Sequence, residues 1–143
     1  MVERHVILRS LSKMLIPVIM LFALYVQFHG DYGPGGGFQA GVIFGAGIIL
    51  YTLIFGLHRA RLVFKPRFLQ YLMAFGVFLY GSVGLAGILK GGNFLDYSHL
   101  AHDPVHGQHL GILLVELGVG ITVCAVMATL FFVFAERRRR EDV

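Results

Sequence analysis

Four long uncharged runs, made mainly of apolar residues, divide the chain. They are 17, 27, 22 and 32 residues long, and the last is interrupted only by Glu116. A membrane-spanning helix needs about 20 predominantly apolar residues, and lipid-exposed irregular backbone would leave polar groups unpaired. The pattern therefore predicts an all-α integral membrane protein with four transmembrane helices, near Leu11–Phe28, Phe38–Leu57, Phe68–Leu89 and His109–Ala135.

Composition supports the same class. Hydrophobic residues make up 57% of the chain, charged residues only 14%, and the mean hydropathy is +0.75. These values lie outside the usual range of soluble domains. With 143 residues and four spans there is no room for a soluble domain. We expect one transmembrane domain over residues 1–143, with a basic cytoplasmic tail at 136–143.

The basic residues are distributed unevenly between the two sides of the predicted spans. Eleven of the twelve lie before the first span or at its start, between the second and third spans, or after the fourth, and only Lys90 lies on the other side. The positive-inside rule makes the basic side cytoplasmic, so both termini are expected in the cytoplasm. The net charge of +4 is then explained by topology and lipid headgroups, not by nucleic acid.

Glu116 is the only acid within a predicted span, which makes it the first candidate for ion or proton handling. If Ala135 marks the cytoplasmic edge, about 20 residues of helix cover the roughly 30 Å core and bring Glu116 near its outer edge. The acid could then open a cation or proton path, or it could be a headgroup-level or structurally paired carboxylate.

Histidines precede Glu116 along the same stretch. Asp103-Pro104 is typical of a helix start, with an N-cap followed by a first-turn proline. A row at steps of four, three, four and three follows: His102, His106, His109, Leu113 and Glu116. This row could relay protons, bind a transition metal through His102 and His106, or be a solvated helix start outside the membrane.

A glycine-rich turn, DYGPGGGFQAG, joins the first two spans at residues 31–41. Its glycines allow unusual backbone angles and Pro34 fixes one of them, so a shaped turn is expected. Asp31 could meet a cation, although turn formation is commoner for aspartate. We expect Gln27 and Gln39 to bond the exposed backbone. Small residues spaced by four favour contact with another subunit, and they are Gly37, Gly41 and Gly45.

Other chemistry finds little support in the sequence. No histidine lies in the middle of a span, so axial haem ligation lacks ligands. The glycine run has neither the lysine nor the hydroxyl of a phosphate-binding loop. Cys124 lies alone in the fourth span and is interpreted as a small apolar filler. We assign no cofactor and no resident metal, and an enzyme acting alone is not expected.

The run FHGDYGPGGGFQAG, from Phe28 to Gly41, resembles the signature of the MrpB family, the small membrane subunits of the Mrp-type (Mnh/Sha/Pha) multisubunit monovalent cation/proton antiporters. The resemblance extends over essentially the whole chain. Ala40 departs from the second glycine often found beside Gly41. The motif covers Pro34, Gly35, Gly36, Gly37, Phe38, Gln39 and Gly41.

This resemblance implies a multi-pass subunit of a hetero-oligomeric Na⁺/H⁺ antiporter in a prokaryotic plasma (inner) membrane, with Li⁺ or K⁺ as alternative cations. The implied partners are large subunits similar to the proton-pumping subunits of respiratory complex I, other small membrane subunits and the lipid bilayer. The motif assigns no role to Glu116 or the histidines. Two alternatives stay open: a structural scaffold without an ion path, and a stand-alone channel or metal transporter that uses the histidine row.

Overall fold

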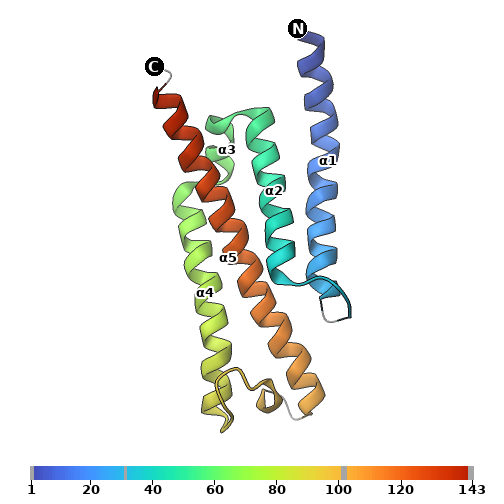
Figure 1. Cartoon of the computed structure of the whole chain (residues 1–143), viewed down its shortest axis with the longest axis vertical. Helices are drawn as coiled ribbons and strands as arrows, with labels where there is room; N and C mark the ends of the chain where they lie inside the picture. The colour runs from blue at the N-terminus through green and yellow to red at the C-terminus, as the bar shows by residue number, and fades with distance from the viewer. Residues whose placement is uncertain (1, 31, 101–102, 142–143) are drawn as a thin grey trace.

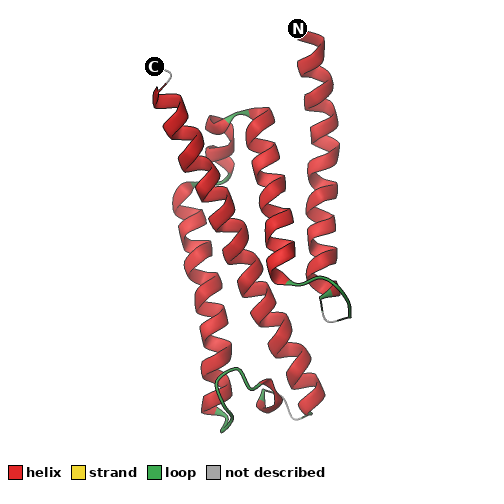
Figure 2. Cartoon of the chain, viewed as in Figure 1, coloured by secondary structure: helices red, strands yellow, loops and turns green. Residues whose placement is uncertain are grey.

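The computed structural model describes residues 2–30, 32–100 and 103–141, and these residues contain helices and no strand (Figure 2). The helices are α1 (Val2–His29), α2 (Gly37–Phe55), α3 (Leu57–Val63), α4 (Pro66–Leu89), the 3-10 helix η1 (Tyr97–His99) and α5 (Pro104–Glu141). Within the described residues, α1, α2, α4 and α5 are long and apolar enough to cross a membrane. The predicted all-α membrane fold with four spans is therefore confirmed.

The long helices are arranged around α5. It packs against α4 on one side and α2 on the other, while α1 packs mainly against α2 (Figure 1). The start of α1, the short helix α3 and the end of α5 lie at one end of the bundle. We call this the basic end, because Arg61, Lys65 and Arg67 also lie there. The opposite end carries η1 and is called the η1 end.

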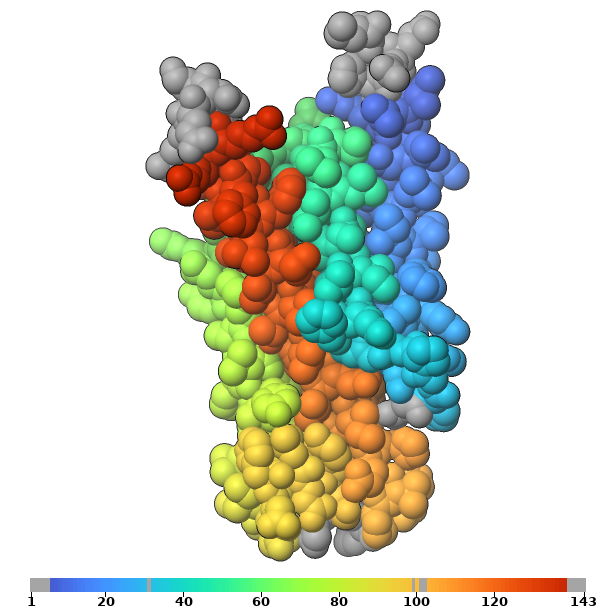
Figure 3. Space-filling view, in the orientation of Figure 1, coloured from blue at the N-terminus to red at the C-terminus, as the bar shows by residue number. Residues whose placement is uncertain are grey.

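The helices do not reach equally far toward the η1 end. The turn between α1 and α2 stops beside the middle of α5, whereas α4 and α5 continue past it (Figure 1). Glu116 lies at the level of this turn, and α5 begins 12 residues earlier at Pro104, which is about 18 Å along a helix axis. In Figure 3 the η1 loop and the first part of α5 form the tip of the molecule beyond the turn.

The most tightly packed apolar cluster lies toward the basic end. Its buried members come from α2, α3, α4 and α5, and they are Ile48, Ala60, Leu69, Ala125, Ala128 and Phe132. Beside the cluster, Arg61 of α3 donates two hydrogen bonds to Glu136 of α5, with N···O distances of 3.2 and 2.7 Å. This paired contact fixes the short helix α3 against the end of α5.

Much of each span is left uncovered by the rest of the chain. Only 17% of the most apolar window of α1 and 33% of that of α2 are buried within the protein. The exposed side chains include large apolar ones such as Phe22, Leu53 and Phe78. Such surfaces are at home against lipid or against another membrane protein.

The start of α5 agrees with the interpretation of Asp103-Pro104 as a helix start. Its first residue is Pro104, the Asp103 carbonyl accepts from the Gly107 N–H at 3.0 Å, and the Asp103 carboxylate accepts from the Val105 N–H at 3.2 Å. This is the hydrogen bonding of an N-cap residue, so this local prediction is confirmed.

Candidate functional site

The glycine-rich turn folds back onto the last turn of α1. The N–H groups of Tyr32 and Gly33 donate to the His29 carbonyl at 3.0 and 3.1 Å, and the Gly36 N–H donates to the Val26 carbonyl at 3.2 Å. These bonds pair carbonyls that the end of α1 would otherwise leave open. Gly36 has a φ of +115°, which an L side chain rarely adopts, so glycine is needed for the chain to turn into α2 here.

The carboxylate of Glu116 lies against this turn. A Cβ atom placed on Gly30 would be 2.8 Å from Oε2 of Glu116, and one placed on Gly36 would be 2.9 Å from Oε1. A Cβ on Gly37 would overlap the backbone carbonyl of Glu116. Three glycines thus leave the space in which α5 brings its acid up to the junction of α1 and α2.

The start of α2 faces the same carboxylate. The N-cap residue Gly36 has no side chain to bond the free N–H groups of the first turn, and Glu116 of α5 reaches this position instead. The amino end of a helix carries partial positive charge, so it favours a negative group beside it. Glu116 is half-buried, which leaves it open to exchange with water or an ion.

The structure connects His109 to the turn and leaves His106 away from it. The rings of His109 and Tyr32 are stacked with centroids 6.5 Å apart, so α5 meets the turn through both His109 and Glu116. His106 is exposed instead, and its Nδ1 lies 2.8 Å from a carboxylate oxygen of Asp103. This hydrogen bond, followed by that from the Val105 N–H, lowers the pKa of Asp103.

Two of the predicted positions, Asp31 and His102, lie outside the described residues. Among the residues that are described, no group of three His, Cys, Asp or Glu side chains is arranged to hold a metal ion. The suggested metal pair of His102 and His106 therefore stays a prediction. The resulting candidate site consists of Glu116, His109 and the glycine turn.

The glycines of α2 pack against α5 of the same chain. A Cβ on Gly41 would be 2.6 Å from the Gly120 carbonyl, and one on Gly45 would be 3.2 Å from the Met127 Cβ. The sequence favoured a subunit contact for this stripe, but its close approach is made inside the chain. Phe38 and Gln39, the next motif residues, are exposed.

Gln27 differs from its expected role. It is only 5% exposed, and its Oε1 would lie 2.9 Å from a Cβ on Gly120 of α5. Its Nε2 is buried and has no hydrogen-bond partner among the described residues. The expectation that this amide bonds the turn backbone is therefore not met by its nitrogen. Sequence alone could not reveal this, because the space for the side chain is created by a glycine 93 positions later.

The fold and the site together define a class: an integral membrane protein with four spans that holds a carboxylate at a glycine turn between helices. The chain belongs to the family described as related to the MnhB subunit of Na⁺/H⁺ antiporters, whose model matches residues 7–129. This confirms the resemblance to the MrpB family of the Mrp-type antiporters.

Curated relatives agree over nearly the full length. A protein of Staphylococcus haemolyticus (strain JCSC1435) named "Putative antiporter subunit mnhB2" is 35% identical over 133 residues, which is 91% of this chain and 94% of the relative. A protein of the same name from Staphylococcus aureus (strain Newman) is 33% identical over 132 residues, covering 90% and 93% of the two chains.

Proposed function

We propose that this chain is a membrane subunit of a multisubunit Na⁺/H⁺ antiporter, that it helps to assemble the complex, and that Glu116 forms part of a cation or proton entrance facing outward. Family membership over most of the chain supports the antiporter assignment. The single observation that supports the entrance is the carboxylate of Glu116 lying against Gly30 and Gly36 at the start of α2.

The proposed orientation places the basic end in the cytoplasm and the η1 end outside a prokaryotic plasma membrane. Its support is the charge distribution, because Lys90 is the only basic residue on the η1 side. Ions arriving from outside would then descend past the first part of α5 before reaching the turn. His109 lies between the tip of α5 and Glu116, where a titratable ring can pass protons.

The chemistry of the site suits an exchange between Na⁺ and H⁺. A carboxylate binds either a hard cation or a proton, and it cannot hold both in the same way at once. Irregular backbone at membrane depth is tolerated where it is buried in protein or lines a water-filled cavity. The glycine turn beside Glu116 is such backbone, and partial hydration would give ions access to the acid.

The assembly claim is tested by purifying the tagged chain from its own membranes in mild detergent. We expect several larger hydrophobic subunits to co-purify and a native mass well above that of a small oligomer. Recovery of the chain alone would contradict the antiporter assignment and favour the stand-alone channel or metal transporter, which needs His102, His106 and His109.

Orientation and water access are tested by single cysteines placed in a Cys124→Ala background. Tyr32 is 81% exposed at the turn, so Tyr32→Cys should react with a membrane-impermeant maleimide added to intact cells. Arg59→Cys at the basic end should react only in everted vesicles. The reverse pattern would refute the orientation, and protection of Tyr32→Cys from both sides would argue against a hydrated entrance.

A structural scaffold remains the second candidate, and the close helix contacts of Gly37, Gly41 and Gly45 favour it. Under this alternative the glycine turn holds the helices together while ions pass through other subunits. Replacing Glu116 by glutamine would then leave exchange intact in an assembled complex.

A further inference from the structure

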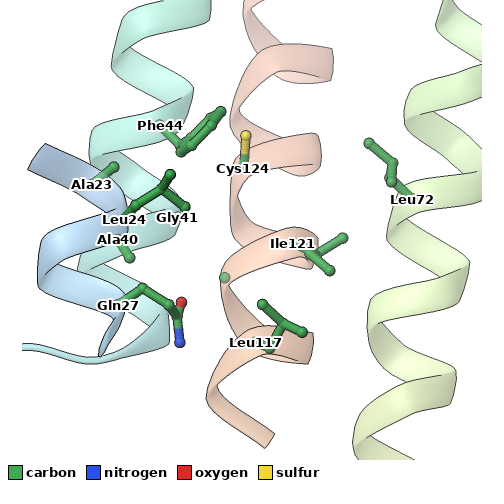
Figure 4. Close-up of a pocket in the computed structure, with 11 residues that line it drawn as sticks. Ala23, Leu24, Gln27, Ala40, Gly41, Phe44, Leu72, Leu117, Ile121 and Cys124 are labelled. Carbon is green, nitrogen blue, oxygen red and sulfur yellow. The ribbon is translucent and has the colours of Figure 1, made fainter. Parts of the chain in front are cut away.

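An apolar groove of about 210 Å³ runs along one face of α5. Its walls include Leu24 of α1, Phe44 of α2 and Leu72 of α4, while Ile121 and Cys124 of α5 lie between them (Figure 4). Almost no polar surface is exposed inside it. A groove of this kind between membrane helices is filled by a lipid chain or by part of another protein.

Gln27 gives this groove a specific chemical requirement. Its side chain extends from α1 toward α5 and contributes to the lining (Figure 4). It is only 5% exposed and its Nε2 is an unpaired donor among the described residues. A buried donor without a partner destabilises the protein by about 1–3 kcal/mol. The occupant of the groove should therefore bring a hydrogen-bond acceptor as well as apolar surface.

The depth of Gln27 argues against a lipid as the source of that acceptor. Gln27 packs over Gly120, and nearby Gly118 is in close contact with Gly76 of α4. Gly76 is 10 residues from the start of α4 and 13 from its end, or about 15 and 20 Å along the helix. Ester carbonyls lie at the edges of a hydrocarbon core about 30 Å thick, and acyl chains carry no acceptor.

We propose that a transmembrane helix of another antiporter subunit docks in this groove and presents a side-chain oxygen to Gln27. Small residues beside Gln27, namely Ala23 and Ala40, let a neighbouring backbone approach, and polar side chains bond across such interfaces. The small buried share of α1 is consistent with a helix covering it in the complex. This proposal rests on the assembly role proposed above, but it does not depend on Glu116 carrying ions.

Photo-crosslinking in the assembled complex tests the docking directly. Benzoylphenylalanine replaces Leu24, which lines the groove and is 44% exposed, or Phe22, which is 53% exposed and does not line it. We expect the Leu24 probe to crosslink to a transmembrane segment of a stoichiometric subunit, identified by mass spectrometry of the joined peptides. Adducts with lipid alone, or none in an intact complex, would overturn the proposal.

The hydrogen bond is tested by Gln27→Leu, with Gln70→Leu as the matched control at an exposed glutamine of α4. Gln27→Leu should lower the Leu24 crosslink yield about three- to tenfold, while Gln70→Leu leaves it unchanged. An unchanged yield in Gln27→Leu would refute the donor role. Failure of the antiporter assignment would look different, because the wild-type chain would then purify without other subunits.

Discussion

At the scale of single residues, the position of Glu116 depends on atoms that are absent. Gly30 and Gly36 leave room for its carboxylate, and Gly37 leaves room for its backbone. Gly36 also needs a positive φ. The same position serves packing and chemistry, because the space that lets α2 approach α5 is the space in which the acid meets the turn.

Gly36→Ala should disturb the site more than an ordinary glycine replacement. The added methyl group would meet the Glu116 carboxylate in a backbone conformation that alanine disfavours, and we expect a loss of about 1–3 kcal/mol in stability. Gly81→Ala is the control, because nothing lies within 4 Å of a Cβ there and alanine favours the helix of α4. Thermal unfolding of the purified complex should separate the two variants, and equal midpoints would contradict this view of the turn.

His109 can be tested for proton transfer separately from packing. His109→Phe keeps an aromatic ring for stacking on Tyr32 but cannot titrate. If His109 relays protons, we expect His109→Phe to assemble normally and to exchange ions several-fold more slowly, with an altered pH profile. Wild-type exchange and pH profile in His109→Phe would instead assign the ring to packing.

At the scale of elements, α5 organises the molecule because it contacts α2 and α4 and ends beside α3. Arg61 and Glu136 make the tie to α3, and both side chains are about one-third exposed. At the other end of α5, Asp103 caps the helix and pairs with His106. The two ends of this helix are thus fixed by different polar contacts.

Arg61→Lys should loosen α3 only modestly. Lysine cannot make the two parallel hydrogen bonds that arginine makes to Glu136, but a partly exposed pair contributes only about 1 kcal/mol or less. We expect slightly faster proteolysis near residues 57–63 and an unchanged complex. Loss of the whole complex would show that this pair does more than fix α3.

Acid should fray the first turn of α5. The pKa of Asp103 is lowered in the folded protein, so the stabilisation is present above the ordinary pKa and is lost as pH falls through the lowered value. Hydrogen exchange should show reduced protection near Val105 in strong acid. Asp103→Asn should reduce this pH dependence, and an identical dependence in the variant would contradict the assignment.

At the scale of the whole molecule, the four spans form an incomplete bundle. The α1–α2 turn ends beside Glu116 while α4 and α5 continue for about 18 Å, and much of α1 stays uncovered. A chain with such a step and a lateral groove is suited to be part of a larger assembly. Family membership gives this shape its biological setting.

The sequence predicted the number of spans, the turn and the start of α5, because apolar run length, glycine content and capping chemistry are local. It could not predict that Glu116 lies against Gly30 and Gly36, or that Arg61 pairs with Glu136, since these contacts join distant positions. It also assigned the glycines of α2 to a contact with a different chain. Spacing shows that a helix can be approached closely, but it does not show which neighbour approaches.

The most direct test of the central claim is Na⁺-dependent pH change in everted vesicles that carry the assembled complex with Glu116→Gln. Glu136→Gln is the matched control, since it neutralises a glutamate of the same helix at the basic end. We expect both variants to assemble, Glu116→Gln to lose at least about tenfold in exchange, and Glu136→Gln to stay near wild type. Wild-type exchange in assembled Glu116→Gln would contradict the entrance and leave the chain a scaffold.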